Sequence, residues 1–335
     1  MKATPSKSAS FTQLFMLAIA LAFCSPVYAS EQQPTLTPKA IFILIDGIPA
    51  DVIESVSTPA LDSISGMGGY TRAYVGGEIG TPTESPTISA VGYQSMLTGT
   101  WANKHNVYDN KVDNPDYQYW DIFRIAKNHD GELRTAIFST WLDNRTKLIG
   151  DGLDAAGGKK IDFHADGFEL DTERFPHDAE ISHIRTIDGV VSNAASAHIK
   201  EAGPDLSWVY LEDPDHVGHK YGDSEQLTAA VQLADQRLGK IWQAVQNRQE
   251  SHHEDWLVVV TTDHGRDALT GKGHGRQSQR ERTTWIASNS TNLSDHFSQT
   301  PAIVDILPSI ASHMGIAIPS QVAEHLEGQS FINPP

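Results

Sequence analysis

The fold is constrained most by short, largely apolar runs that end at a charged or polar residue. They are residues 40–45 (AIFILI), 134–138, 206–211 (LSWVYL) and 256–261 (WLVVVT), with a weaker run at 283–287. Consecutive apolar residues, many of them β-branched, are typical of a strand that is buried on both faces of a parallel sheet. We therefore expect a buried, mostly parallel sheet.

Helical spacing separates two of these runs. Apolar residues recur every three or four positions over residues 227–245, and Asp223 with Gln226 can form a capping box at the start of that helix. Strands that alternate with amphipathic helices predict an α/β fold, a three-layer sandwich with a mostly parallel central sheet. Residues 141–175 are rich in Gly and Asp and weakly periodic, which predicts a small cap or loop insertion. No repeat or low-complexity linker divides residues 30–335, so we expect one domain there.

The first 29 residues form a separate segment. Lys2 and Lys7 precede an apolar run at residues 15–23, and the tripeptide VYA that ends at Ala29 has small residues at the two positions that a signal peptidase reads. The apolar run is too short to span a bilayer of about 30 Å, which disfavours the alternative of an N-terminal membrane anchor. We expect a signal peptide that is cleaved after Ala29, and hence a periplasmic or secreted protein without membrane attachment after cleavage.

The charge and the cysteine content exclude some partners. Lys plus Arg total 25 against 42 Asp plus Glu, which gives a formal net charge of −17. Such a surface repels polyphosphate backbones and anionic lipid, so we expect no binding to duplex nucleic acid. The only cysteine, Cys24, lies within the predicted signal peptide. Neither a disulfide framework nor a thiolate zinc site is therefore expected in the mature chain.

Metal-ligating side chains follow the predicted strands or lie in nearby turns. They are Asp46, Asp215, His219, Asp263, His264 and His274. The carboxyl ends of parallel strands meet at one edge of a sheet, where ligands bind. Each motif alone is also typical of a turn or a solvated loop, and Asp215 with His219 could be a structural i, i+4 pair. Together, three carboxylates and three imidazoles suit two divalent ions of the zinc type.

A candidate nucleophile lies in residues 81–99, a turn-rich loop that leads into a short helix near Ser89. A hydroxyl at the start of a helix lies near free backbone N–H groups, which attract anions. Coordination to a metal ion can make such an alcohol nucleophilic without a neighbouring histidine base. The alternative is a helix-capping serine with no chemical role.

Taken in order, Asp46, Ser89, Asn110 and the Asp/His motifs resemble the alkaline phosphatase superfamily, most closely its type I phosphodiesterase/nucleotide pyrophosphatase branch. The resemblance covers about residues 39–288 and includes Thr98-Gly99 after Ser89. It implies an alkaline phosphatase-like catalytic domain at residues 30–335, with Ser89 as the nucleophile and Asn110 as a donor to a phosphoryl oxygen. It also implies two zinc ions. The ligands of the first would be Asp215, His219 and His274. The ligands of the second would be Asp46, Asp263 and His264, and this ion would also touch Ser89.

Two positions bear on how far the resemblance extends. Many members of the branch use threonine as the nucleophile, so Thr87 is the alternative to Ser89, although the spacing to Thr98-Gly99 favours Ser89. Ala90 stands where nucleotide-cleaving members typically have an aromatic residue that stacks on the base.

These features predict a secreted, metal-dependent phosphodiesterase that hydrolyses phosphodiester or pyrophosphate bonds of a small phosphate ester. The reaction would pass through a covalent phosphoserine and use two divalent metal ions, expected to be Zn²⁺. Between residues 81 and 110 the only Lys or Arg is Lys104, and the neutral Asn110 suits a singly charged diester better than a dianion. The alternatives are a phosphomonoesterase or phosphonate hydrolase of the same superfamily, or a catalytically idle protein that binds zinc or phosphate.

Overall fold

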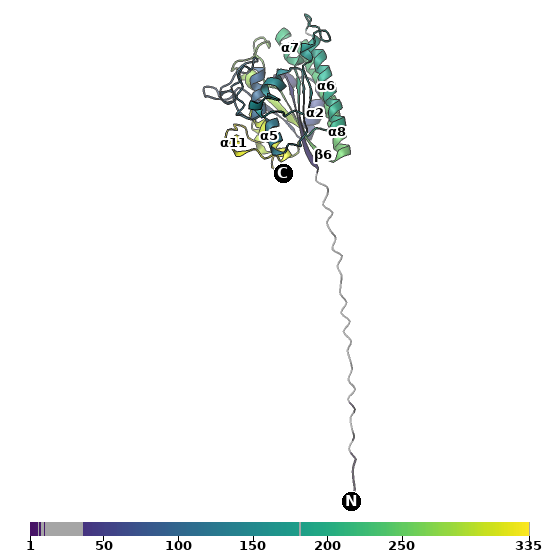
Figure 1. The fold of residues 1–335 in the computed structure, drawn as a ribbon. Helices are drawn as coiled ribbons and strands as arrows, with labels where there is room; N and C mark the ends of the chain where they lie inside the picture. The colour runs from purple at the N-terminus through teal and green to yellow at the C-terminus, as the bar shows by residue number, and fades with distance from the viewer. Residues whose placement is uncertain (6, 8–9, 11–35, 181, 335) are drawn as a thin grey trace. The chain divides into compact units, whose positions relative to one another are not determined.

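The computed structural model describes residues 1–5, 7, 10, 36–180 and 182–334, which are drawn in colour in Figure 1. Apart from residues 1–5, 7 and 10, the predicted signal peptide and its cleavage site after Ala29 lie outside the described residues. The described helices and strands belong to one compact unit, residues 36–335. No described helix is both long and apolar enough to cross a membrane.

A central sheet runs through this unit. Its described strands are β1 (Thr37–Ile45), β2 (Gly69–Tyr74), β3 (Thr135–Ser139), β4 (Phe163–Ala165), β5 (Leu206–Leu211), β6 (Glu254–Thr261) and β7 (Thr283–Ser288). They are ordered β2-β7-β6-β1-β5-β3-β4. All neighbouring pairs are parallel except β2–β7 and β6–β7, which are antiparallel. The prediction of a mostly parallel sheet is confirmed.

Helices cover both faces of the sheet. The described helices are α1 (Ala50–Ile53), α2 (Pro59–Met67), α3 (Ser89–Thr98), α4 (Ala102–His105), α5 (Ile122–His129), α6 (Ser182–Ala202), α7 (Asp213–Tyr221), α8 (Glu225–His252), α9 (Gln279–Arg282), α10 (Ile306–Met314) and α11 (Ser320–Ala323). α2, α6 and α8 pack on one face, while α3, α5 and α10 pack on the other (Figure 1). This confirms the predicted three-layer α/β sandwich.

Strand β1 lies at the centre because it is apolar on both sides. Alternate residues of the strand face the two helical layers. The side chains on the α3 side are Ala40, Phe42 and Leu44, and those on the α8 side are Ile41, Ile43 and Ile45. A strand with two apolar faces is stable only between two layers, so this segment occupies the middle of the sheet.

The structure differs from the prediction at the sheet edges. Strands β2 and β4 were not predicted, because an edge strand is partly exposed and lacks a continuous apolar run. β4 lies within residues 141–175, for which the sequence predicts a small cap or loop insertion. That segment instead supplies the edge strand, together with the short helical turns Asn144–Leu148, Asp154–Ala156 and Phe168–Leu170.

The start of α8 also differs from the prediction, since Ser224 rather than Asp223 is the capping residue. The Ser224 side chain accepts a hydrogen bond from the backbone N–H of Leu227. The Asp223 carboxylate instead accepts a hydrogen bond from Arg280 at 2.9 Å. Both residue types cap helices well, so a tertiary ion pair decides between them.

Helix α3 is buried along its whole length and begins at Ser89, as the sequence predicts. Gly92 lets this helix approach the end of β6, because a Cβ at that position would lie only 3.0 Å from the backbone oxygen of Asp263. A glycine inside a helix costs about 1 kcal/mol relative to alanine. Here it brings the start of α3 against the carboxyl edge of the sheet.

Candidate metal centre

The predicted ligands gather at the carboxyl ends of β1, β5 and β6. Asp46 directly follows β1, and its backbone N–H donates to the last carbonyl of β5 at 2.9 Å. Asp263 and His264 follow β6, which is paired with β1 in parallel register. Helix α7 follows β5 and carries Asp215 and His219 one turn apart. The parallel arrangement therefore places residues from three distant parts of the chain at one edge.

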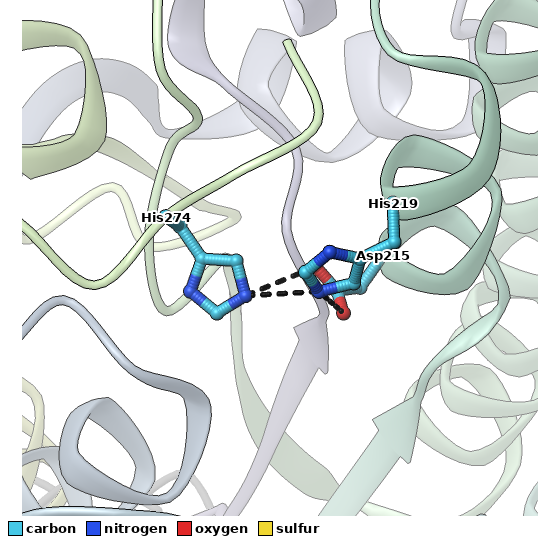
Figure 2. A group of neighbouring side chains, drawn as sticks. All are labelled: Asp215, His219 and His274. Carbon is cyan, nitrogen blue, oxygen red and sulfur yellow. Dashed lines mark hydrogen bonds and ion pairs between the residues drawn. The ribbon is translucent and has the colours of Figure 1, made fainter.

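The first group consists of Asp215, His219 and His274, as the resemblance implies. Their ligand atoms all lie within 4.8 Å of one another. His219 Nε2 is 3.2 Å from Asp215 Oδ2 and 3.0 Å from His274 Nε2. Figure 2 shows His274 reaching from its loop toward the two side chains on α7. These three side chains can hold one cation.

The second group lies beside the first and shares Asp215 with it. Ligand atoms of Asp46, Asp215 and His264 also lie within 4.8 Å of one another. Asp263, which the resemblance pairs with Asp46 and His264, lies next to this group, with its Oδ2 atom 3.2 Å from His264 Nε2. Its Oδ1 atom accepts a hydrogen bond from the Gly47 N–H at 3.1 Å. The structure thus brings all six predicted ligands together and places Asp215 between the two groups.

Two carboxylate oxygens near His264 have no hydrogen-bond partner among the described residues. They are Asp46 Oδ1 and Asp263 Oδ2, and both are buried. An unpaired buried polar atom is costly, and a bound divalent cation would remove that cost. The donors are carboxylate oxygens and imidazole nitrogens, which is a set that Zn²⁺ accepts. The residues present therefore fit divalent cations.

His264 and His274 present Nε2 atoms that can bind a metal. Nδ1 of His264 lies 2.9 Å from the Gly265 carbonyl oxygen, and Nδ1 of His274 lies 2.8 Å from that of Thr87. A carbonyl oxygen only accepts, so each Nδ1 carries the proton and each Nε2 keeps a lone pair. Burial lowers the pKa of both rings, which are therefore neutral near pH 7. Neutral imidazole is the form that ligates metals.

Three buried carboxylates share this space. Burial and mutual repulsion raise the pKa of Asp46 well above its ordinary value and that of Asp263 to about 7. For Asp215, burial opposes ionisation, but the hydrogen bond from His219 and the charge of Arg266 hold the pKa well below its usual range. Added positive charge would favour the ionised form of all three carboxylates.

Ser89 lies beside the second group. Its Oγ atom is 3.3 Å from His264 Nε2. The next residue, Ala90, donates its backbone N–H to Asn110 Oδ1 at 3.0 Å. This contact orients the Asn110 amide so that its NH₂ group is the end that can donate to a ligand. Ser89 and Asn110 line one pocket of about 300 Å³ together with ligands of both groups.

The alternative nucleophile, Thr87, uses its hydroxyl elsewhere. That hydroxyl donates to the Arg276 carbonyl at 2.7 Å and accepts from the Gly275 N–H at 2.9 Å. The residue is 0% exposed. Thr87 therefore connects the loop before α3 to the loop that carries His274. Its hydroxyl is less available for chemistry than that of Ser89.

The pocket also contains residues that the sequence analysis missed. They are Tyr93, Trp141, Tyr210, Glu212 and His216. Two of them could have been predicted from their position in the sequence. Tyr93 lies one helical turn after Ser89, and His216 adjoins Asp215. Among the described residues, no lysine or arginine lines this pocket.

Arg266 is a further residue that the sequence analysis missed. It is 0% exposed, and its guanidinium donates to the side chain and the backbone carbonyl of Asp215. It also donates to the Gly47 carbonyl at 3.1 Å. Gly218 makes room for it, because a Cβ at that position would overlap the guanidinium. Arg266 therefore holds Asp215 through its Oδ1 atom, whereas His219 contacts the Oδ2 atom.

Arg266→Met is expected to lower the free energy of unfolding of the metal-free protein by about 3 kcal/mol, because it leaves the Asp215 carboxylate buried without its main cation. Urea denaturation in the presence of a chelator measures this. Arg276→Met, which replaces an exposed side chain, should stay within about 0.5 kcal/mol of the wild type. A loss below about 1 kcal/mol for Arg266→Met would show that the buried ion pair contributes little.

Comparisons with known proteins agree with this arrangement. Residues 40–309 match the family model for type I phosphodiesterase / nucleotide pyrophosphatase. A venom phosphodiesterase from Naja atra is 35% identical over 244 residues, which cover 69% of this chain and 26% of that protein. A bis(5'-adenosyl)-triphosphatase from Xenopus laevis is 21% identical over 262 residues, which cover 76% of this chain and 53% of that protein. The matches thus span about a quarter to a half of these relatives.

Solved structures share the fold at low sequence identity. The phosphonate monoester hydrolase of Agrobacterium radiobacter superimposes with a TM-score of 0.61 at 13% identity, over 88% of this chain and 76% of that one. The lipoteichoic acid synthase LtaP from Listeria monocytogenes gives a TM-score of 0.57 at 17% identity, over 88% of this chain and 75% of that one. These likenesses agree with the predicted alkaline phosphatase-like fold. Because the family model covers most of the chain, the protein belongs to the type I phosphodiesterase/nucleotide pyrophosphatase family of hydrolases.

Proposed function

We propose that this protein is a secreted, metal-dependent phosphodiesterase that hydrolyses phosphodiester or pyrophosphate bonds through a covalent phosphoserine at Ser89. The observation that carries the proposal is the position of the Ser89 hydroxyl, 3.3 Å from His264 Nε2 and inside the pocket. The unpaired oxygens of Asp46 and Asp263 lie in the same region. Membership of a family of phosphate-ester hydrolases supports the reaction class.

Two divalent cations, expected to be Zn²⁺, would be held by two sets of side chains, namely Asp215, His219 and His274, and Asp46, Asp263 and His264. When bound, such cations supply Lewis acidity that neutralises phosphoryl oxygens and favours ionisation of an alcohol. Two divalent charges outweigh three carboxylates by one unit, and Arg266 adds another positive charge. The site would therefore attract a phosphate ester even though the whole protein is acidic.

Ser89 would carry the covalent chemistry. Its Oγ atom bonds to phosphorus and loses its proton to solvent, while the bond from phosphorus to the leaving oxygen breaks and that oxygen takes a proton from solvent. Water then attacks phosphorus and loses a proton to solvent, the bond from phosphorus to Oγ breaks, and Oγ regains a proton. The Asn110 amide donates to a phosphoryl oxygen, and the positive end of the α3 dipole faces the same group.

The pocket favours a singly charged substrate, because no described lysine or arginine lines it and Asn110 is neutral. On zinc-loaded protein, we expect kcat/KM for bis-p-nitrophenyl phosphate to exceed that for p-nitrophenyl phosphate by at least about tenfold, or about 1.4 kcal/mol. Asn110→Ala should cost diester turnover about 2 to 4 kcal/mol of transition-state stabilisation. Asn114→Ala, in the same loop and outside the pocket, is the matched control.

Other outcomes of the ester panel would reassign the function. A preference for the monoester would indicate a phosphomonoesterase, and a preference for a phosphonate ester would indicate a phosphonate hydrolase. A protein that binds two zinc ions yet turns over no ester would be a binding protein.

The proposal includes export through residues 1–29. N-terminal sequencing of protein from the periplasm or the medium should find Ser30 first. Recovery of an active protein that retains residues 1–29 would remove secretion from the proposal.

A further inference from the structure

Two buried tyrosines donate hydrogen bonds to one oxygen of Asp46. The Tyr210 hydroxyl lies 2.7 Å from Asp46 Oδ2, and the Tyr93 hydroxyl contacts the same oxygen. The two phenol oxygens are 2.9 Å apart. Each hydroxyl has one proton. With a cation beside it, Asp46 would be ionised and would be the strongest acceptor of the three groups, so both protons would go to Asp46.

This contact leaves one oxygen of Asp46 for another partner. Oδ2 is occupied by two donors, whereas Oδ1 is buried and has no hydrogen-bond partner among the described residues. Oδ1 lies 3.5 Å from His264 Nε2, on the side of the second group. Asp46 can therefore ligate a cation there through Oδ1 alone.

The two tyrosines connect Asp46 to the element that carries the nucleophile. Tyr93 lies four residues after Ser89 on α3, so the two side chains share a helical face. Tyr210 lies on β5, opposite Leu44 of β1 in the parallel register. The tyrosine rings pack edge to face with centroids 5.1 Å apart, and they are 1% and 2% exposed. The position of Asp46 relative to Ser89 therefore depends on this pair.

We propose that Tyr93 and Tyr210 are positioning residues that fix Asp46 as a single-oxygen ligand and set its distance from Ser89. The inference rests on the proposed function, because it assumes a cation at Asp46. Two neutral phenols can hold the carboxylate without adding a positive charge next to that cation. Asp215 differs in this respect, since the charged Arg266 holds it.

The test uses Tyr93→Phe, Tyr210→Phe and the double variant, which keep the rings and remove only the hydroxyls. In the double variant, we expect the zinc affinity of one of the two sites to fall about 10- to 100-fold, while the other site is unchanged. Titration against a chromophoric chelator measures both affinities. KM for the diester should not change, because the phenol protons go to Asp46 and not to the substrate.

Tyr70→Phe is the matched control, because the Tyr70 hydroxyl also donates to a carboxylate, that of Glu54 at 3.0 Å, outside the pocket. It should leave both zinc affinities unchanged. Unchanged zinc affinities in the tyrosine-pair variants would overturn the inference, as would a raised KM at unchanged zinc affinity. If the double variant does not fold, the single variants carry the test. If the wild-type protein binds two zinc ions and cleaves diesters, the proposed function stands even when the inference about the tyrosines fails. If the wild-type protein binds no zinc, both the proposed function and the inference are overturned.

Discussion

Ser89→Ala is expected to lower kcat for a diester by at least about a thousandfold, because it removes the covalent nucleophile. The zinc content should stay near two ions per chain, since the six Asp and His ligands remain. Steady-state kinetics and metal analysis of the same sample measure the two quantities. Loss of activity together with loss of zinc would show instead that Ser89 is mainly a ligand.

Thr87→Val separates the two candidate nucleophiles. It keeps the volume of the side chain but removes the hydroxyl that connects to Gly275 and Arg276. We expect it to lower stability and still to permit formation of the phosphoenzyme. Acid-quenched wild-type protein should carry the phosphoryl group on Ser89 when its peptides are analysed by mass spectrometry. A phosphoryl group on Thr87 would show that the nucleophile has been misassigned.

Chelation of divalent ions is expected to abolish hydrolysis, and two equivalents of Zn²⁺ should restore it. The reason is electrostatic, because the site holds three buried carboxylates, and two of their oxygens have no hydrogen-bond partner in the part of the chain that the structure describes. Zinc should also raise the midpoint of thermal unfolding, because the buried carboxylates come together only in the folded protein and zinc therefore binds the folded state preferentially. Atomic emission and calorimetry on matched metal-free and loaded samples measure both effects.

His274→Ala tests the number of ions, because it removes one ligand of the first group and leaves the second group complete. It should lower the zinc content from two ions to one. His164→Ala replaces an exposed histidine that pairs with Asp166 and belongs to neither group, and it should keep both ions. A wild-type sample that is fully active with a single ion would contradict the two-ion model.

The central strands and the ligand motifs could be predicted because their signals are local. β1 is apolar on both faces, and Asp46 follows it directly, so neither inference needs a contact to a distant residue. The edge strands β2 and β4 escaped prediction because an edge position does not require a continuous apolar run. The start of α8 was misplaced by one residue because Asp223 forms an ion pair with Arg280.

The sequence by itself determined the fold class, the family resemblance and the six candidate ligands, since hydrophobic periodicity and motif spacing are properties of residues close together in the chain. Only the tertiary structure decided that Asp215 lies between the two groups and that Arg266 holds it. It also decided which oxygen of Asp46 is free, through Tyr93 and Tyr210. These hydrogen bonds join side chains from different elements, and their geometry depends on how those elements pack rather than on any spacing along the chain.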